Sequence, residues 1–224
     1  MYLQASDTDD AIVAILRFHS GFFDHYLVNT VRMAGVGLHA LESILATTDD
    51  EDSITVRANC QFNLVNFTFE DVETHESRNM AADIVAIPQY HVPFDDSIYR
   101  YEVVVGVPSE ELRRIFVTLR NVGPGAAVVY ITASKVRFYT IGQEITLTKE
   151  NGECIIGGVK DDNEIICIPA SLHKIDPILE ASKLCGTVWL LYSTRRLTDS
   201  GRPPTMINCP IGLMANLCFY FIKE

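Results

Sequence analysis

One block of sequence occurs twice in this chain of 224 residues. Residues 172–179 (LHKIDPIL) match residues 38–45 (LHALESIL), a shift of 134 positions. The same shift, without gaps, aligns residues 53–56 with 187–190 and residues 10–13 with 144–147. A shared offset over separated segments is typical of a duplicated structural unit, and so long a period indicates a whole domain. The sequence therefore predicts two copies of one fold.

The two copies differ at their front ends. The second copy contains an amphipathic segment, Ser109–Val122, whose counterpart in the first copy would precede Met1. We therefore expect the first copy to lack about one helix and one strand at its front.

Composition limits the class of protein. Hydrophobic residues make up 48% of the chain and charged residues 21%, which suits two packed cores in a soluble protein. The net charge of −11 argues against a wholly basic nucleic-acid or membrane binder but permits a local basic lining. The six cysteines show no CxxC pair, so we expect reduced thiols in the core. Acidic residues near the start, Asp7, Asp9 and Asp10, argue against a signal peptide.

Hydrophobic periodicity predicts many strands and three helices. The expected helices are Val36–Thr47, Ser109–Val122 and Ala170–Leu184. Ser109 is the expected cap of the second helix, and Pro177 either kinks the third or starts it afresh with Asp176 as cap. Expected strands cover residues 11–18, 54–57, 63–69, 127–132, 135–140, 144–148, 164–168, 187–193 and 216–222. This mixture favours an antiparallel α+β fold.

The expected domain limits follow from the repeat. Residues 1–84 form the first domain, 85–99 a connector and 100–224 the second domain. The connector contains two prolines, which exclude it from a sheet interior. It also contains the apolar residues Tyr90, Val92 and Phe94. It either packs on its own protein or serves as a docking site.

Motifs of catalysis and metal binding are missing from the sequence. The acidic runs 7–10 and 49–52 lack the glycine and terminal glutamate of a calcium loop. The six histidines have no ligand spacing, and no nucleophile elbow or phosphate loop occurs. We therefore expect neither enzymatic activity nor a cofactor nor a metal.

Several short blocks, in order over nearly the whole chain, resemble one known family. They include Asp52–Ala58 (DSITVRA), Val107–Leu112 (VPSEEL) with Arg114, Ile115 and Leu119, Val136–Phe138 and the final Leu217–Lys223. Together they resemble the eukaryotic sliding-clamp family of proliferating cell nuclear antigen. The resemblance implies two like domains per chain, three chains in a ring around duplex DNA, sheets outside and helices lining the hole.

Function follows from the same resemblance. Such a ring catalyses no reaction; it is a processivity factor that tethers DNA polymerases and repair proteins through clamp-binding peptides. The implied partners are duplex DNA, bound without sequence preference, those client proteins, and a clamp loader. The implied location is the nucleus, and the implied assembly is a homotrimer.

The resemblance identifies five basic residues as DNA-facing. Sequence-independent binding needs cations opposite phosphates. The second and third expected helices supply Arg113, Arg114, Arg120, Lys174 and Lys183. The alternative is an ordinary solvated helix face. The first helix departs from the family, with Ser43 and Ala46 in place of lysines, so we expect a weaker positive lining there.

A client pocket is also implied. The family's connector element corresponds to Tyr90, His91, Val92 and Pro93, followed by Phe94, and the strand beneath it to Ala11 and Val13. Ile222 and Lys223 replace the family's Ala-Pro at the chain's end. We expect a pocket with altered specificity for peptides carrying Gln-x-x-aliphatic-x-x-aromatic-aromatic.

Ring closure needs one edge strand from each domain. The resemblance assigns Ser77–Ile84 of one chain and Ile141–Thr148 of the next. The residues expected at this interface are Asn79, Met80, Ile84, Ile145 and Leu147. Asn79 stands where the family has an aromatic residue, which weakens the contact.

Two other interpretations remain open. The chain could be one subunit of a heterotrimeric checkpoint clamp, which would suit a weak first-domain lining and an altered interface. Alternatively, it could be a clamp-derived docking module that never encircles DNA.

Overall fold

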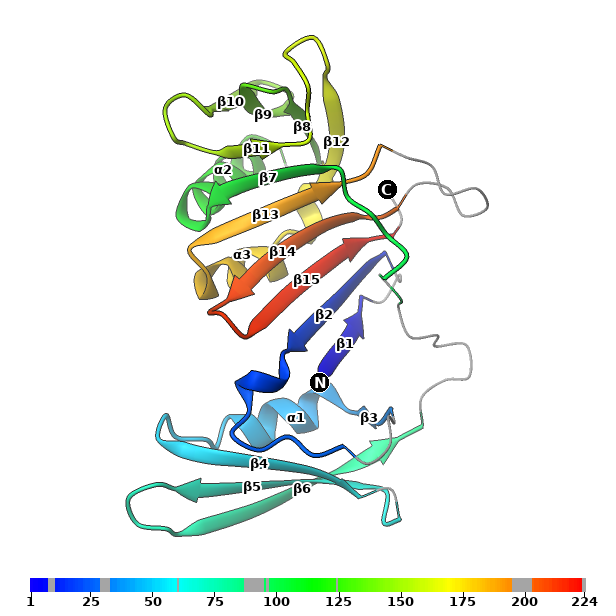
Figure 1. The fold of residues 1–224 in the computed structure, drawn as a ribbon, viewed down its shortest axis with the longest axis vertical. Coiled ribbons are helices and arrows are strands. Elements are labelled where there is room, and N and C mark those ends of the chain that lie inside the picture. Colours follow the sequence, from blue (N-terminus) through cyan, green and yellow to red (C-terminus); the bar gives the residue numbers. More distant parts are fainter. Residues whose placement is uncertain are drawn as a thin grey trace. The chain divides into compact units, whose positions relative to one another are not determined.

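The computed structural model describes residues 1–7, 11–28, 33–59, 61–86, 95, 97–123, 125–194 and 203–222. The chain divides into two compact units. The large unit comprises Met1–Tyr26 and Phe94–Glu224, and the small unit comprises Leu27–Pro93. Every strand pair described is antiparallel. With its few helices, this architecture confirms the predicted α+β clamp fold (Figure 1).

A seven-stranded sheet organises the large unit. Its order is β1 (Tyr2–Ser6), β2 (Ile12–Phe18), β15 (Ala215–Phe221), β14 (Thr205–Ile211), β13 (Thr187–Tyr192), β7 (Val103–Pro108) and β11 (Ile155–Gly157). A short 3₁₀ turn, η1 (Ser20–Phe22), follows β2. Pairing of β2 with β15 joins the beginning of the chain to its end. Residues 1–26 therefore pack with the second copy. The predicted domain limits describe which segments repeat in the sequence, and they do not describe which segments pack together.

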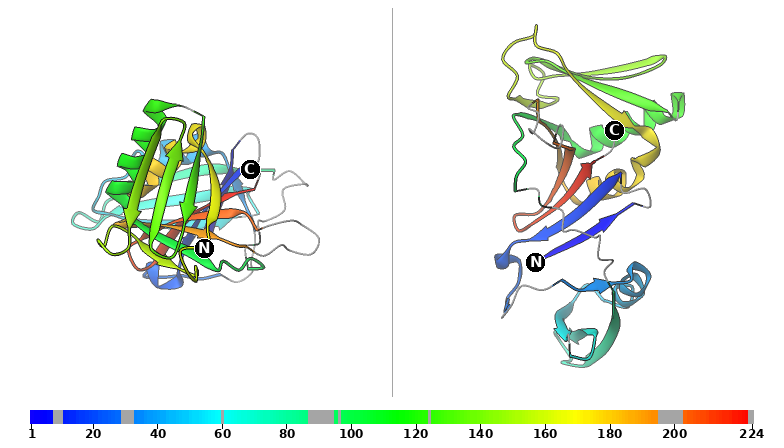
Figure 2. Two further views of the ribbon diagram at one scale, coloured as in Figure 1. Left: turned by 90° about the horizontal axis from the view of Figure 1, so that it is seen from above. Right: turned by 90° about the vertical axis from the view of Figure 1, so that its right-hand side faces the viewer.

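The second sheet of the large unit has four strands. Its order is β10 (Gln143–Thr148), β9 (Lys135–Thr140), β8 (Ala126–Ile131) and β12 (Ile166–Ser171). Two helical segments accompany the sheets: α2 (Ser109–Val122), and the run of η2 (Leu172–Lys174), α3 (Asp176–Ala181) and η3 (Ser182–Leu184). Figure 2 shows α2 lying along the sheet of β8, β9 and β10.

The main core lies between these sheets and helices. Helix α2 buries Leu112, Ile115, Phe116 and Leu119, the stripe that its periodicity predicts. The ring of Phe116 meets the ring of Phe138 on β9 edge to face, with centroids 6.1 Å apart. Helix α2 therefore anchors the large unit through one continuous apolar face.

Helix ends differ in part from the predictions. Helix α2 has the predicted bounds, but Ser109 does not cap it; its hydroxyl lies 3.3 Å from the thiol of Cys185. For the segment Ala170–Leu184 the structure shows the second predicted alternative, a fresh start: α3 begins at Asp176 with Pro177 in its first turn, although Ile175 and not Asp176 occupies the cap position. Proline lacks an amide hydrogen and disfavours helical geometry in the preceding residue, so the helix cannot run through it.

The small unit contains one sheet and one helix. The sheet order is β3 (Gly35–Val36), β6 (Ser77–Val85), β5 (Leu64–Asp71) and β4 (Asp52–Asn59), and the helix is α1 (Leu38–Leu45). Helix α1 is shorter than predicted because Val36 belongs to β3. The small core consists of Ile44, Val65, Phe67, Phe69 and Ala82.

The cysteines largely follow the prediction of reduced core thiols. Cys154, Cys209 and Cys218 are buried and free, whereas Cys167 is free but exposed, which corrects the prediction for that residue. Burial raises the pKa of the Cys154 thiol, which keeps it protonated. In the described part of the chain no helix is long and apolar enough to cross a membrane, and no group of three or more potential ligands could hold a metal.

Candidate functional site

The five basic side chains expected to face DNA lie on neighbouring helical segments of the large unit. Arg113, Arg114 and Arg120 belong to α2, Lys174 to η2 and Lys183 to η3. Contacts join the two segments. The guanidinium of Arg113 donates to the carbonyl and hydroxyl oxygens of Ser182, at 2.8 and 3.3 Å, and Arg120 pairs with Asp176. The fold therefore brings the predicted residues together.

The other three cations also have partners. Nε of Arg114 donates to Glu111 at 2.8 Å, and Nζ of Lys183 donates to Glu180 at 2.6 Å, each pair spanning one helical turn. Nζ of Lys174 donates to Asp7 at 2.6 Å. Hydrogen bonds from Arg114 lower the pKa of Glu111, and those from Lys174 and the Ile12 and Ala11 amides lower the pKa of Asp7. Both carboxylates are thus ionised at neutral pH, and the pairs persist.

Charges on these helices nearly cancel. Residues 109–122 and 172–184 carry five lysine and arginine side chains against four carboxylates, Glu110, Glu111, Asp176 and Glu180. Helix α1 has no lysine or arginine, and its Glu42 lies 3.7 Å from the imidazole of His39. Exposed pairs of this kind are weak and can exchange partners. The helices can meet phosphates, but their own carboxylates compete for the same cations.

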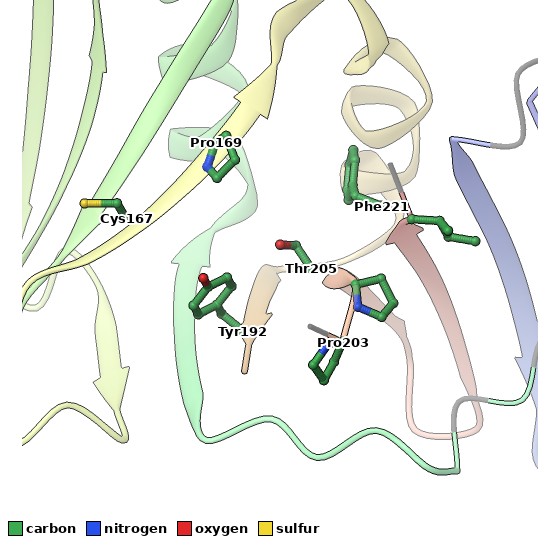
Figure 3. Close-up of a pocket in the computed structure, with 8 residues that line it drawn as sticks. Cys167, Pro169, Tyr192, Pro203, Thr205 and Phe221 are labelled. Atoms are coloured by element: carbon green, nitrogen blue, oxygen red, sulfur yellow. The ribbon is translucent and has the colours of Figure 1, made fainter. Parts of the chain in front are cut away.

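A cavity of about 200 Å³ opens in the large unit where the ends of four strands meet (Figure 3). Its walls come from β12, β13, β14 and β15, and its lining residues are Cys167, Pro169, Tyr192, Pro203, Pro204, Thr205, Phe221 and Ile222. The hydroxyl of Tyr101 donates to the carbonyl of Pro204 at 3.0 Å, which fixes one wall. The lining combines apolar side chains and prolines with the hydroxyl groups of Tyr192 and Thr205, a mixed surface that can accept a side chain of a bound peptide.

The predicted pocket residues are placed unevenly. Ile222 lines the cavity, and its amide donates to the carbonyl of Ala11 at 2.8 Å, so these two residues are adjacent. Val13 is buried in a separate small cluster with Ile15, Cys218 and Tyr220. Tyr90, His91, Val92, Pro93 and Phe94 lie outside the described residues.

Sequence reasoning missed most of the cavity. Thr205 begins β14 and Pro204 directly precedes it; the hydrophobic pattern did not predict this strand. Tyr192 and Cys167 lie on predicted strands, but only the sheet order brings them to one place. A proline pair directly before an apolar stretch, Pro203-Pro204, was the one local signal available.

In the described residues, each of the two expected ring edges includes a stretch of strand that is open on one side. β10 ends the four-stranded sheet and pairs only with β9. β6 pairs with β5 through residues 77–83, and β3 meets it only at Ile84 and Val85. Residues 77–83 therefore present a second edge without a described partner strand.

Side chains along these two edges differ in how far they are exposed to solvent. Met80, Ile84 and Ile145 are half-buried against their own cores, and Leu147 is almost fully buried. Asn79 is exposed and accepts a hydrogen bond from Thr68 at 2.7 Å. Backbone groups, supplemented by half-buried apolar side chains, are what the edges offer to another strand.

Antiparallel sheets with few helices place the chain in the class of two-domain α+β DNA-clamp folds. Comparison with known proteins agrees. Residues 1–91 match the family model described as "Proliferating cell nuclear antigen, N-terminal domain". The proliferating cell nuclear antigen of Chaetomium thermophilum is 24% identical over 234 residues, which cover 99% of this chain and 84% of that protein. These two similarities support a protein of the proliferating cell nuclear antigen family.

Proposed function

We propose that this chain is a sliding-clamp subunit that closes into a homotrimeric ring around nuclear duplex DNA. The ring is loaded by a clamp loader and tethers DNA polymerases and repair proteins, without catalysing a reaction itself. The observation that carries this proposal is the pair of open strand edges, residues 77–83 of β6 on the small unit and β10 on the large unit. Similarity to the proliferating cell nuclear antigen family supports a sliding-clamp-type role at the level of the family.

Head-to-tail pairing of these two edges is the physical basis of the ring. Unpaired backbone groups on an outer strand readily accept another strand, and two different edges on one chain make a heterologous contact that can close into a ring. Half-buried Met80 and Ile145 add apolar contact on their respective edges.

A second candidate function rests on a specific observation. The near-cancellation of charge on the helices favours a chain that docks client proteins without holding DNA, or one that shares a heterotrimeric ring with more basic partners, as in a checkpoint clamp. The client peptide would bind in the cavity of about 200 Å³ described above, here called the client cavity. Because this cavity lies within the large unit, peptide binding does not depend on ring closure.

Mass and DNA retention together test the main proposal. Light scattering behind a sizing column should give a mass near three times the 25.0 kDa of one chain. The ring should stay on closed circular DNA at raised salt and leave when the circle is cut. A monomer that co-assembles with a full-length clamp would instead support the heterotrimer, and a monomer that binds only client peptides would support the docking module.

Ring stability should respond to Asn79. Replacing it by tyrosine restores the aromatic residue of the family at an exposed position on β6. An aromatic cross-strand contact contributes roughly 0.5–1.5 kcal/mol, so the trimer should dissociate at a concentration about tenfold lower. Dilution series by mass photometry measure this. Asn163→Tyr, in an exposed turn of the large unit, is the matched control and should leave the mass distribution unchanged.

Client binding should depend on Ile222. Ile222→Asp places a charge at the rim of the cavity, where a bound peptide would exclude water, and should weaken binding of a peptide with the motif Gln-x-x-aliphatic-x-x-aromatic-aromatic by roughly tenfold or more. Ile222 is 43% exposed, so the fold tolerates the change. Ile155→Asp makes the same substitution at an exposed site on β11 and should bind normally. Fluorescence anisotropy of a labelled peptide measures both affinities. Equal affinities of Ile222→Asp and Ile155→Asp would argue against this cavity as the client site.

A further inference from the structure

The outer face of the four-stranded sheet in the large unit carries a continuous row of side chains. Cys167 on β12 lies opposite Tyr130 on β8, and Tyr130 lies opposite Arg137 on β9. Directly opposed residues of antiparallel strands share one face of the sheet, so these three side chains are neighbours. Cys167 also lines the client cavity, as does Pro169 on the same strand (Figure 3). The row therefore begins at the client cavity and ends at a cation.

The guanidinium of Arg137 is oriented by its surroundings and has hydrogen bonds left to give. Its Cζ lies over the ring of Tyr130, 5.4 Å from the centroid, and this cation–π contact fixes its position. Its Nε is buried, and no described group accepts a hydrogen bond from it. The carboxylate of Glu144 lies 3.9 Å from Nη1, which is too far for a hydrogen bond. A planar guanidinium can bind a carboxylate through two parallel hydrogen bonds, so Arg137 is prepared for an acidic partner.

A second row on the same face is apolar. Val128 on β8 lies opposite Pro169 on one side and Tyr139 on the other. Tyr139 is 39% exposed, and its ring meets the ring of Tyr130 with centroids 6.4 Å apart. Lys135 on β9 adds a second positive charge to the face. The face thus offers an apolar strip beside two cations, which complements an acidic peptide segment with apolar residues.

We propose that this face is a subsite for the flank of a bound client peptide, and that Arg137 binds an acidic residue in that flank. The inference rests on the proposed client cavity and specifies the sequence of its ligand. Cys167 and Arg137 are separated by two strand spacings, about 9–10 Å. An extended peptide advances about 3.3 Å per residue, so the acidic residue should lie about three positions from the residue that fills the cavity. The residues between them would cross Val128 and Tyr130.

Three labelled peptides test this subsite on the full chain. Each carries the motif Gln-x-x-aliphatic-x-x-aromatic-aromatic. One has three glutamates before the motif, one has three glutamates after it, and the third has glutamines at both places. One of the acidic peptides should bind the wild type about three- to fivefold more tightly than the neutral peptide, as one half-exposed ion pair allows. This advantage should fade as the salt concentration rises, because exposed charges are screened. Fluorescence anisotropy measures all three affinities.

Three variants locate the advantage. Arg137→Gln should abolish it and leave binding of the neutral peptide unchanged, with circular dichroism to verify the fold. Lys149→Gln removes the same charge at an exposed position directly after β10 and should keep the advantage. Glu144→Gln should enlarge it, because this change removes the carboxylate that competes for Arg137.

Failure of the subsite and failure of the client cavity give different results. If the neutral peptide does not bind at high micromolar concentration, the client cavity is refuted and the subsite with it. If the neutral peptide binds but neither acidic peptide gains affinity, only the subsite is refuted. The same conclusion follows if the advantage survives Arg137→Gln, or if Lys149→Gln removes it equally, since a general effect of net charge would then explain it.

Discussion

Replacing Phe116 by alanine is expected to lower the free energy of unfolding of the large unit by about 3–5 kcal/mol. The ring is 1% exposed, and it contacts Phe138 edge to face. Truncation removes the burial of the ring and leaves a cavity between α2 and β9 that the surrounding strands cannot fill. Such a loss is a large part of the stability of a typical domain.

The chain contains a convenient probe for this measurement. Its only tryptophan, Trp189, lies on β13 in the large unit, and its ring lies against Gly106 of β7. Fluorescence in a urea titration therefore reports the large unit, independently of the small one. Val117→Ala, on the same helix at a 39% exposed position, should cost well under half as much. Equal losses for the two variants would contradict the assignment of Phe116 to the core.

Local pattern predicted the fold wherever one element carried its own signal. The bounds of helix α2 were predicted correctly because an amphipathic stripe begins directly after Pro108 and is followed in the sequence by Gly123-Pro124. β7 was missed because Val103–Val107 shows no polar–apolar alternation and contains Gly106. β14 was missed because Asn208 and Pro210 disturb its alternation. Both strands are fixed by pairing with β13, which is a tertiary effect.

Candidate site residues were predictable as positions but not as contacts. The five cations follow from the family resemblance and lie together on the helices. The pairs Glu111–Arg114 and Glu180–Lys183 could have been read from helical spacing. The pairing of Lys174 with Asp7 spans 167 positions and depends on how β1 and β2 join the large unit. Most of the cavity lined by Tyr192, Thr205 and Phe221 depends likewise on sheet order.

The paired cations lead to the second large effect. A variant with Glu111→Gln, Asp176→Asn and Glu180→Gln should bind duplex DNA far more tightly than the wild type. These carboxylates hold Arg114, Arg120 and Lys183, and each released cation can neutralise one phosphate. Three such contacts steepen log K against log salt by roughly 2.7, which corresponds to on the order of 10²-fold tighter binding near 0.1 M salt. Losing Asp176 and Glu111 from helix first turns costs about 0.3–1 kcal/mol each, which the fold can absorb.

A matched variant separates the effect of releasing these three cations from the effect of a less negative net charge. Asp50→Asn, Glu51→Gln and Glu73→Gln change the net charge by the same amount at exposed positions of the small unit. Anisotropy on a short linear duplex over a range of salt concentrations compares the two variants. A steeper slope for the helix variant alone would place phosphates against α2 and α3. Equal gains would indicate a diffuse field effect, since loss of any three carboxylates would then suffice. No gain in either variant would mean that these helices do not face DNA, and the docking function would then be favoured over the ring.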